Sequence, residues 1–423
     1  MSGTIVRAPR ENHYLSSNEA ALGTNPFIGV IYHWIGGFAS ATNFIPFRGI
    51  KRWSWEVYWL IQGFAAWIVA PLVLASLLVP NLFEILRAAP QSCINYALLW
   101  GALWGIGGLT FGLAIRYLGI ALGYAIALGL CTAFGTLIPP IYDGSIRTII
   151  HETSGQIILA GVLLCLIAVA VNGAAGISKD REVTPEVKAE AGETDFSFGK
   201  GLAVAIFAGI MSSFFAFGLK AGAPIGDIAR RELLTHHRLD LWQNLPILIV
   251  VLLGGFVANF IWSAILIVKN HSIRQFVGEP GLNPMRASHA TGQTLVDFDP
   301  LDPSTYERLA PRTIIFNYIF AALAGVIWYF QFFFYSMGQT KMGKYDFSSW
   351  TLHMASIIIF ATLWGLLLKE WHGTSRRTKI LVATGLFLLI SSTVVVGYGN
   401  YLKATETPAS PAQRQAQVEK IAK

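Results

Sequence analysis

The chain has 423 residues, of which 54% are hydrophobic and 13% are charged, and its formal net charge at pH 7 is +7. A soluble domain carries roughly 25% charged residues, so this composition excludes an ordinary soluble protein and indicates a membrane protein. The positive charge lies in loops and in the C-terminal tail rather than in a basic, aromatic-interleaved soluble domain, so nucleic acid is not an expected partner.

Ten apolar runs of about 20 residues, the length that crosses the hydrocarbon core of a bilayer, predict ten helical spans. They lie at about 27–47, 56–79, 94–115, 117–139, 155–177, 199–221, 243–268, 312–338, 347–369 and 378–400. Inside a bilayer every backbone N–H and C=O group needs an internal partner, so the predicted fold class is an all-α polytopic membrane protein.

The two halves of the chain carry similar patterns five spans apart. Residues 33–48 and 207–220 both place small residues first, aromatic residues later and a cation at the end. Residues 104–119 and 328–343 both begin with Trp and end with Gly, 15 positions later. Five is an odd number of spans, so a second copy would be upside down in the membrane, which predicts inverted repeats of the kind found in transporters.

Polar segments separate the spans and bound the predicted units. The start of the chain lacks the basic and apolar regions of a cleaved signal peptide. Segment 222–242 alternates polar and apolar residues at helical spacing and is expected to lie at the membrane interface. The predicted units are a polar extension at 1–26, a first five-helix repeat at 27–177, a charged linker at 178–198, a second five-helix repeat at 199–400 with an inserted loop at 270–311, and a polar tail at 401–423.

Loop charge predicts the orientation of the chain. The loops that follow the odd-numbered spans, with their flanks, hold 17 of the 31 Lys and Arg residues, against 8 in the remaining loops. Basic residues favour the cytoplasmic side, so both chain ends are predicted to lie outside. Lys220 and Arg116 lie near span ends, where long basic side chains are expected to reach the headgroups.

Polar side chains inside spans are costly and are therefore candidates for function. His33 shares a helix face with Ser40 and Phe44, and Asp346 precedes His353 by two helical turns. Histidine titrates near physiological pH, and a carboxyl group taken out of water can do so too. We therefore predict that His353, His33 and Asp346 exchange the proton of a transport cycle. The alternative is that the histidines bond a neighbouring helix and the aspartate is merely interfacial.

The stretch WYFQFFFY, residues 328–335, places one amide among seven aromatic residues. An amide offers donors and acceptors that complement vicinal sugar hydroxyls, and aromatic faces pack against the C–H faces of a pyranose ring. The alternative is a glutamine that bridges two helices. The predicted substrate-binding residues are Gln331, Tyr329, Phe332, Trp350, Asn43, Phe44 and Ser40.

The sequence contains no P-loop, GxSxG, HExxH or CxxC motif, so no soluble-enzyme signature is present. Cys93, Cys131 and Cys165 lie in or beside apolar runs and are expected to be free, buried thiols. A membrane-embedded transferase would need an acid–base pair or a metal cluster, whereas the polar groups here are single and dispersed. We therefore predict a transporter that uses no cofactor or metal and is not driven by ATP, rather than an enzyme.

Five stretches of the sequence, taken in order, carry a resemblance to a known family. They are HWIGGFASATNFIPFRGIKRWSWE, WGIGGLTFGLAIRYLG, IWYFQFFFYSMG, YDFSSWTLHM and LLLKEWHG. Together they closely resemble the bacterial L-rhamnose–proton symporter family of the drug/metabolite transporter superfamily, from about residue 28 to about residue 400. The resemblance implies ten helices in two inverted five-helix repeats, and uptake of a methylpentose with a proton. Lys220 stands where a neutral residue is usual in that family.

Together, the residues and the resemblance predict a proton-coupled importer of L-rhamnose or a related 6-deoxy sugar. It would lie in the bacterial inner membrane and work by alternating access. Its partners are the sugar, the proton and the lipid bilayer, and its oligomeric state stays open. The alternatives are a transporter of another small metabolite, in either direction, or a membrane sensor that binds a sugar without moving it.

Overall fold

The computed structural model describes residues 25–118, 120–182, 198–279, 307–369 and 371–405. Every regular element in these ranges is a helix. Nine stretches of the described chain are long and apolar enough to cross a membrane. The prediction of an all-helical, multi-pass membrane protein is therefore confirmed.

Each of the ten predicted spans contains a described helix. They are α2 (Pro26–Thr42), the second span (Trp55–Leu78), α6 (Gln91–Leu118), α7 (Ile120–Tyr142), α9 (Thr153–Glu182), α11 (Phe198–Ala221), α13 (Leu245–Lys269), α15 (Pro311–Lys341), α16 (Ser349–Leu367) and α17 (Arg376–Thr405). The nine candidate membrane spans do not include α2, which has 17 residues. Asn25 caps α2, because its side chain accepts a hydrogen bond from Ile28 N.

The second span is interrupted rather than a continuous α-helix. It runs as α3 (Trp55–Phe64), a π-helical turn η2 (Ala65–Val69) and α4 (Ala70–Leu78). Pro71 has no backbone N–H, and its ring crowds the carbonyl group four residues earlier, on Trp67. Trp67 lies within the π-helical turn, which is the local adjustment expected for a disturbed hydrogen-bond ladder.

Glycines allow α6 and α13 to pack backbone against backbone. A Cβ atom on Gly101 would collide with the carbonyl oxygen of Val251, and one on Gly254 would collide with that of Leu98. Such contacts between small residues give membrane helices close packing without a hydrophobic driving force. The third and seventh spans are therefore held close together.

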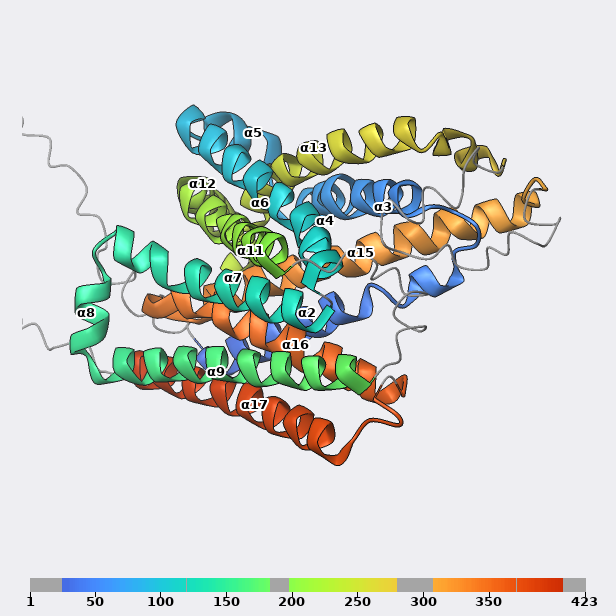
Figure 1. The fold of residues 1–423 in the computed structure, drawn as a ribbon. Helices are drawn as coiled ribbons and strands as arrows, with labels where there is room; N and C mark the ends of the chain where they lie inside the picture. Colours follow the sequence, from blue (N-terminus) through green and yellow to red (C-terminus); the bar gives the residue numbers. More distant parts are fainter. Residues whose placement is uncertain (1–24, 119, 183–197, 280–306, 370, 406–423) are drawn as a thin grey trace, which may run out of the picture.

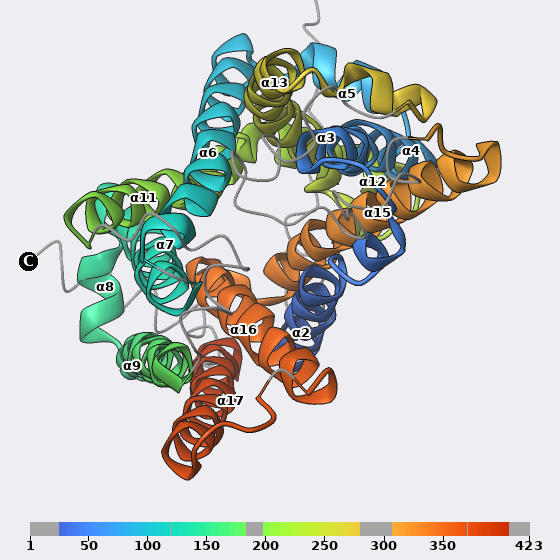
Figure 2. The same ribbon diagram turned by 45° about the vertical axis from the view of Figure 1, so that its right-hand side comes forward.

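The long helices lie alongside one another, and the short helices α5 (Leu82–Ala88), α8 (Ile146–His151) and α12 (Ala223–Thr235) lie at one end (Figure 1). α6 packs on α11, α15 packs on α2, and α9 packs on α17. Figure 2 shows α9 and α17 together at one edge of the molecule and α6 with α13 at another. Each of these pairs joins the two halves of the chain, so the halves form one interleaved bundle.

An aromatic cluster fills the centre of this bundle. Phe332 of α15 stacks on Phe215 of α11, with ring centroids 4.1 Å apart. Phe215 also stacks on Trp350 of α16 at 5.6 Å, and Trp104 of α6 contacts Phe215 at 5.1 Å. Four helices from both halves of the chain therefore meet around a single phenylalanine.

Some of the predicted loops contain helix. α9 continues to Glu182, so the predicted linker begins as helix, and α12 occupies the segment predicted to be interfacial. A 3-10 helix, η4 (Ser272–Val277), follows α13 in the inserted loop, and α17 continues to Thr405 in the predicted tail. The remaining parts of the predicted extension, linker, inserted loop and tail, at 1–24, 183–197, 280–306 and 406–423, lie outside the described residues.

Candidate functional site

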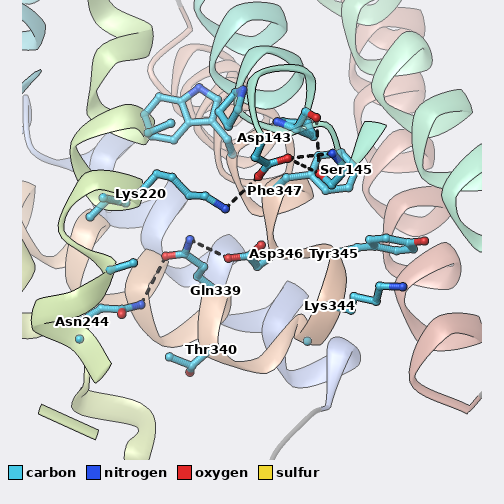
Figure 3. A pocket seen from close by; sticks show the side chains of 18 of the residues that line it. Asp143, Ser145, Lys220, Asn244, Gln339, Thr340, Lys344, Tyr345, Asp346 and Phe347 are labelled. Atoms are coloured by element: carbon cyan, nitrogen blue, oxygen red, sulfur yellow. Dashed lines mark hydrogen bonds and ion pairs between the residues drawn. The ribbon is translucent and has the colours of Figure 1, made fainter. Parts of the chain in front are cut away.

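A cavity of about 490 Å³ opens at one end of the bundle (Figure 3). It lies among the C-terminal ends of α7, α11 and α15 and the start of α13, with the 3-10 turn η6 (Gly343–Ser348) before α16 on one side. Its volume is within the range of small-molecule sites, roughly 300–1,000 Å³. The cavity is therefore the first candidate for a ligand site.

Three polar side chains form a row along the cavity (Figure 3). Asn244, just before α13, donates from Nδ2 to Gln339 Oε1 at 3.3 Å. Gln339 of α15 donates from Nε2 to Asp346 Oδ2 at 3.3 Å. Asp346 is exposed to the cavity and the two amides are half-buried. Each group keeps further hydrogen-bonding capacity, so the row can receive a polar ligand.

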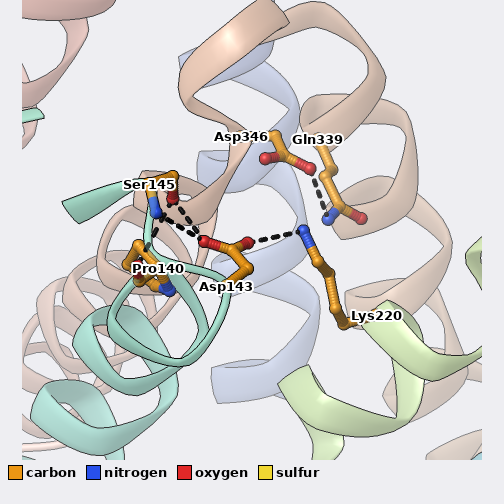
Figure 4. Close-up of polar contacts among 6 residues, drawn as sticks. All are labelled: Pro140, Asp143, Ser145, Lys220, Gln339 and Asp346. Carbon is orange, nitrogen blue, oxygen red and sulfur yellow. Dashed lines mark hydrogen bonds and ion pairs between the residues drawn. The ribbon is translucent and has the colours of Figure 1, made fainter. Parts of the chain in front are cut away.

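An ion pair from α7 and α11 lines the same cavity (Figure 4). Lys220 Nζ lies 3.1 Å from Asp143 Oδ2, while Asp143 Oδ1 accepts hydrogen bonds from Ser145 N at 3.0 Å and Ser145 Oγ at 2.6 Å. Partial burial opposes the charged form, but the bonds from Ser145 and the charge of Lys220 outweigh it and hold the pKa of the Asp143 carboxyl below its usual range. The Asp143 carboxyl therefore stays ionised at neutral pH, and its contact with Lys220 links the two halves of the chain.

Tyr335 and Trp350 form the inner floor of the cavity. Both side chains line it although they are almost fully buried. Trp350 Nε1 donates to the backbone oxygen of Cys131 at 3.0 Å, which fixes the indole against α7. The two rings meet edge to face, with centroids 5.8 Å apart.

Two histidines lie directly behind this floor. The ring of His353 is 5.1 Å from that of Tyr335 and 6.3 Å from that of Trp350, and the His33 ring is 5.3 Å from Tyr335. The imidazoles are fully buried, and their centroids are 6.4 Å apart. Within the described part of the chain, none of their four ring nitrogens has a hydrogen-bond partner. Because buried polar groups are normally paired, this pair is a candidate for binding a proton or a ligand.

Ser356 and Gly338 position the two histidines. Ser356 Oγ lies 2.9 Å from the backbone oxygen of His33 and 2.8 Å from that of His353, so it bridges α2 and α16. A Cβ atom on Gly338 of α15 would come within 2.8 Å of the His33 ring. The absence of a side chain there makes room for the imidazole between the three helices.

A model of the family described as L-rhamnose-proton symport protein (RhaT) matches residues 23–279 and 302–401. The match includes the cavity and the histidine pair. This chain belongs to the L-rhamnose-proton symport family. The L-rhamnose-proton symporter of Klebsiella pneumoniae (strain 342) is 33% identical over 375 residues, covering 88% of this chain and 97% of its own length. A symporter of the same name from Escherichia coli (strain SMS-3-5 / SECEC) is 32% identical with the same coverage. The resemblance in the sequence is thus confirmed, and the chain is a transporter rather than an enzyme.

In this member of the family, two of the ten predicted site residues, Asp346 and Trp350, line the cavity. His33 and His353, which are 320 positions apart in the sequence, are brought together behind it. Trp350 relates the three residues predicted to handle protons, because it lines the same cavity as Asp346 and its ring is 6.3 Å from that of His353. Their roles stay predictions.

The residues predicted around the glutamine lie deeper in this symport-family bundle and do not line the cavity. Gln331, Tyr329 and Phe332 are buried, and the Phe332 ring is 6.2 Å from that of His353. Within the described residues, Gln331 Nε2 and the Tyr329 hydroxyl have no hydrogen-bond partner. A buried amide without a partner is compatible with a ligand contact in another conformation.

The remaining predicted residues lie toward the other end of α2. Asn25 N, at the start of this helix, donates to Lys341 O at the cavity end of α15. Ser40, Asn43 and Phe44 follow about four to five turns later. Ser40 and Asn43 are buried, and Phe44 is 53% exposed. The structure does not bring these three to the cavity.

The polar cavity residues missed as site residues include four that belong to the row and to the ion pair: Asp143, Lys220, Asn244 and Gln339. Lys220, expected to reach the headgroups, lines the cavity instead and pairs with Asp143. All four lie within four residues of a predicted span boundary, where polar residues usually contact headgroups and water. One signal in the sequence could have identified them. They lie at the ends of the fourth, sixth and eighth predicted spans and at the start of the seventh, and in a ten-span topology all of these span ends lie on the same side of the membrane.

Proposed function

We propose that this chain couples the uptake of L-rhamnose, or of a related 6-deoxy sugar, to inward movement of a proton across the bacterial inner membrane. The observation that carries the proposal is the layered site. A polar cavity ends at Tyr335 and Trp350, and two buried histidines without hydrogen-bond partners in the described residues lie immediately behind them. A symporter must bring its sugar and its proton to neighbouring groups, and this arrangement provides both.

The charges of the cavity suit an uncharged ligand. Its charged lining residues are Asp143, Asp227, Asp346, Lys220 and Lys344. Opposite charges nearly balance, so an anionic ligand would gain no net attraction. The amides and carboxylates instead offer hydrogen bonds to hydroxyl groups, which favours a neutral polyol.

The helix contacts support two inverted five-helix repeats. α6 packs on α11 as α15 packs on α2, and α7 packs on α11 as α16 packs on α2. α7 packs on α9 as α16 packs on α17. Exchanging each helix for the one five spans further along therefore reproduces these contacts. In this proposal α2 crosses the membrane as the tenth helix, and the second repeat is inverted relative to the first.

The cavity faces outside in the proposed orientation. It opens at the end that holds both described chain ends, because Asn25 N bonds Lys341 O there and Lys403 pairs with Glu152. The more basic loops lie at the opposite end, which the positive-inside rule places in the cytoplasm. The conformation is then one that receives sugar from outside, and rocking of the two repeats would open the other end.

The direct test is uptake of labelled L-rhamnose by proteoliposomes that contain the purified protein, with and without an imposed pH gradient. A gradient that is acidic outside should drive accumulation. Adding the sugar to lightly buffered, de-energised vesicles should alkalinise the external medium. Uptake that depends on sodium and leaves the external pH unchanged would overturn the proposal of proton coupling. Absence of L-rhamnose uptake would overturn the proposed substrate.

His353→Asn tests the proton step. Asparagine keeps some hydrogen bonding but cannot titrate, so the variant should lose accumulation against a gradient while retaining downhill exchange of L-rhamnose. His33→Asn is the parallel variant. Both activities should be measured in the same proteoliposomes, because concentrative uptake at the wild-type level would remove His353 from the mechanism.

A further inference from the structure

We propose that Asp346, Gln339 and Asn244 form the row that reads the sugar hydroxyls, and that Asp143 keeps this row open by holding Lys220 away from Asp346. The inference rests on the proposed function, since it takes the cavity to be the sugar site. It assigns the recognition of hydroxyl groups to residues at the open end of the bundle, rather than to Gln331 deeper inside.

The first step of the argument is the geometry of the row. The two bonds that join its members use one donor of each amide, the oxygen of Gln339 and one carboxyl oxygen of Asp346. The backbone N–H of Phe347 also donates to the Asp346 carboxyl group. The second hydrogen of each amide, the Asn244 oxygen and the further acceptor positions of the Asp346 carboxylate, which has about four in all, remain available for a ligand. Adjacent hydroxyls of a sugar ring can pair with adjacent groups of this kind.

The second step is the floor behind the row. Trp350 follows Asp346 by four residues, about one helical turn, and both line the cavity. The indole is fixed by its bond to Cys131 O and by stacking on Phe215. A sugar in the cavity thus meets a polar row and an aromatic floor, the two kinds of surface that a neutral polyol with apolar C–H faces requires.

The third step concerns Lys220. Its ammonium group is directed at Asp143, while the Asp346 carboxylate faces Gln339 (Figure 4). Lys220 is nevertheless close enough to Asp346 to interact with it through its charge. Lysine is a flexible point charge on a long side chain, so the position of the Asp143 carboxylate decides which acid Lys220 binds. Ser145 fixes that carboxylate with two hydrogen bonds.

The consequence is a competition that can be tested. If Asp143 loses its charge, Lys220 should turn to Asp346 and form an ion pair inside the sugar site. That pair would occupy the carboxyl group that the sugar needs. Asp143 is then a positioning residue, and its removal should weaken sugar binding only while Lys220 is present.

The experiment measures binding of L-rhamnose to the full-length protein in lipid nanodiscs by titration calorimetry. Asp143→Asn keeps an acceptor for Ser145 and should weaken binding about tenfold, the loss expected when one hydrogen-bond partner is withdrawn. The double variant Asp143→Asn/Lys220→Met should return to near the wild-type affinity, as should Lys220→Met alone. Asp240→Asn, which removes the carboxylate paired with Lys341 outside the cavity lining, is the matched control and should leave the affinity unchanged. Gln339→Leu should weaken binding without rescue by Lys220→Met.

The outcomes distinguish three statements: the competition for Lys220, the role of the row, and the proposed function. Equal weakening in Asp143→Asn and in the double variant would show that Asp143 acts on its own and would overturn the competition. Unchanged binding in Gln339→Leu would overturn the assignment of the row. If the wild-type protein itself does not bind L-rhamnose, the proposed function fails first. The melting temperature of every variant, measured in parallel, distinguishes weakened binding from a damaged fold.

Discussion

Asn244 and Asn270 stand at the two ends of α13, and their surroundings are opposite in kind. Asn244 is half-buried and lines the open cavity. Asn270 is buried, and its Nδ2 donates to Glu56 Oε1 at 3.1 Å, an oxygen that also accepts from Ser272 Oγ at 2.8 Å. Polar groups at one end are open to a ligand, whereas those at the other end are engaged in contacts between segments.

Further contacts hold the end that contains Asn270. Gln275 Oε1 accepts from Ser54 N at 2.7 Å and from Ser54 Oγ at 2.9 Å. Asn317 exchanges two hydrogen bonds with the backbone of Lys51, both 2.9 Å long. Each such bond contributes roughly 1 kcal/mol net, so together they close this end by only a few kcal/mol. A ligand that favours one of two conformations differing by that amount can shift the chain toward it. The closed end can therefore open when a ligand favours the other conformation.

The largest expected effect concerns the floor of the cavity. Cys131 is buried against Trp350, four residues from Gly135 in the cavity lining. In a background with Cys93→Ala and Cys165→Ala, Trp350→Ala should change Cys131 from unreactive to readily labelled by a membrane-impermeant maleimide, because a thiol reacts only where reagent reaches it.

The label should enter from the cavity end, and L-rhamnose should slow it. The control is the same background with Trp350 intact, which should stay unlabelled. Labelling that is equal in both proteins, or that occurs only from the opposite face of the membrane, would contradict the assignment of the open end.

The second prediction concerns the closed end of the bundle, which contains Asn270. Glu56→Ala removes the acceptor for Asn270 and Ser272, and each buried donor left unpaired costs roughly 1–3 kcal/mol. The melting temperature in detergent should fall clearly. Glu84→Ala, on the exposed surface of α5, is the control and should change it little. A loss in Glu56→Ala no larger than in the control would mean that this carboxylate does not hold the closed end.

The third prediction concerns Gln331, between the two ends. Its amide nitrogen has no hydrogen-bond partner among the described residues, so Gln331→Leu should leave stability nearly unchanged. If the amide binds sugar after the floor opens, the apparent affinity in transport should fall about tenfold to a hundredfold, for a lost bond of roughly 1–3 kcal/mol. Reduced stability with unchanged affinity would instead identify a glutamine that bridges helices.

The sequence predicted where helices occur better than how they face one another. Apolar runs reveal spans because backbone groups in a bilayer must bond internally, and a described helix lies in each of the ten predicted runs. Rotation about the helix axis is less visible, because lipid-facing and protein-facing side chains are equally apolar. That is why Gln331 was expected in the cavity although it lies behind it.

The sequence also did not predict which distant segments contact each other. His33 and His353 were both singled out by their cost inside a span, but nothing in the sequence placed their rings 6.4 Å apart. Asn244 and Gln339 were overlooked because polar residues at span ends are ordinary. Their significance arises only when five helix ends converge on one cavity, which is a property of the packing.

The smallest expected effect concerns a cluster around Glu152 at the rim of the open end. Glu152, just before α9, lies 2.6 Å from Lys403 Nζ and 3.4 Å from Lys344 Nζ, and it accepts a hydrogen bond from the Tyr345 hydroxyl. Burial opposes its charge, but these partners outweigh burial and lower the pKa of Glu152 from 4.5 to about 2. The cluster ties α17 to the turn that carries Asp346.

A carboxyl group whose pKa is lowered by folding stabilises the folded state fully at any pH above the pKa that the group has in the unfolded chain. This contribution is lost as the pH falls toward the pKa that the group has in the folded protein. The stability due to Glu152 should therefore be complete above about pH 4.5 and disappear as the pH approaches 2. Its side chain is 26% exposed, so solvent screening reduces the gain to roughly 1 kcal/mol. Melting temperatures of the wild type and Glu152→Gln should differ slightly at pH 7 and converge as the pH falls toward 2, whereas Glu84→Gln should match the wild type throughout. A difference that does not change with pH would show that the cluster stabilises the rim through packing rather than through the charge of Glu152.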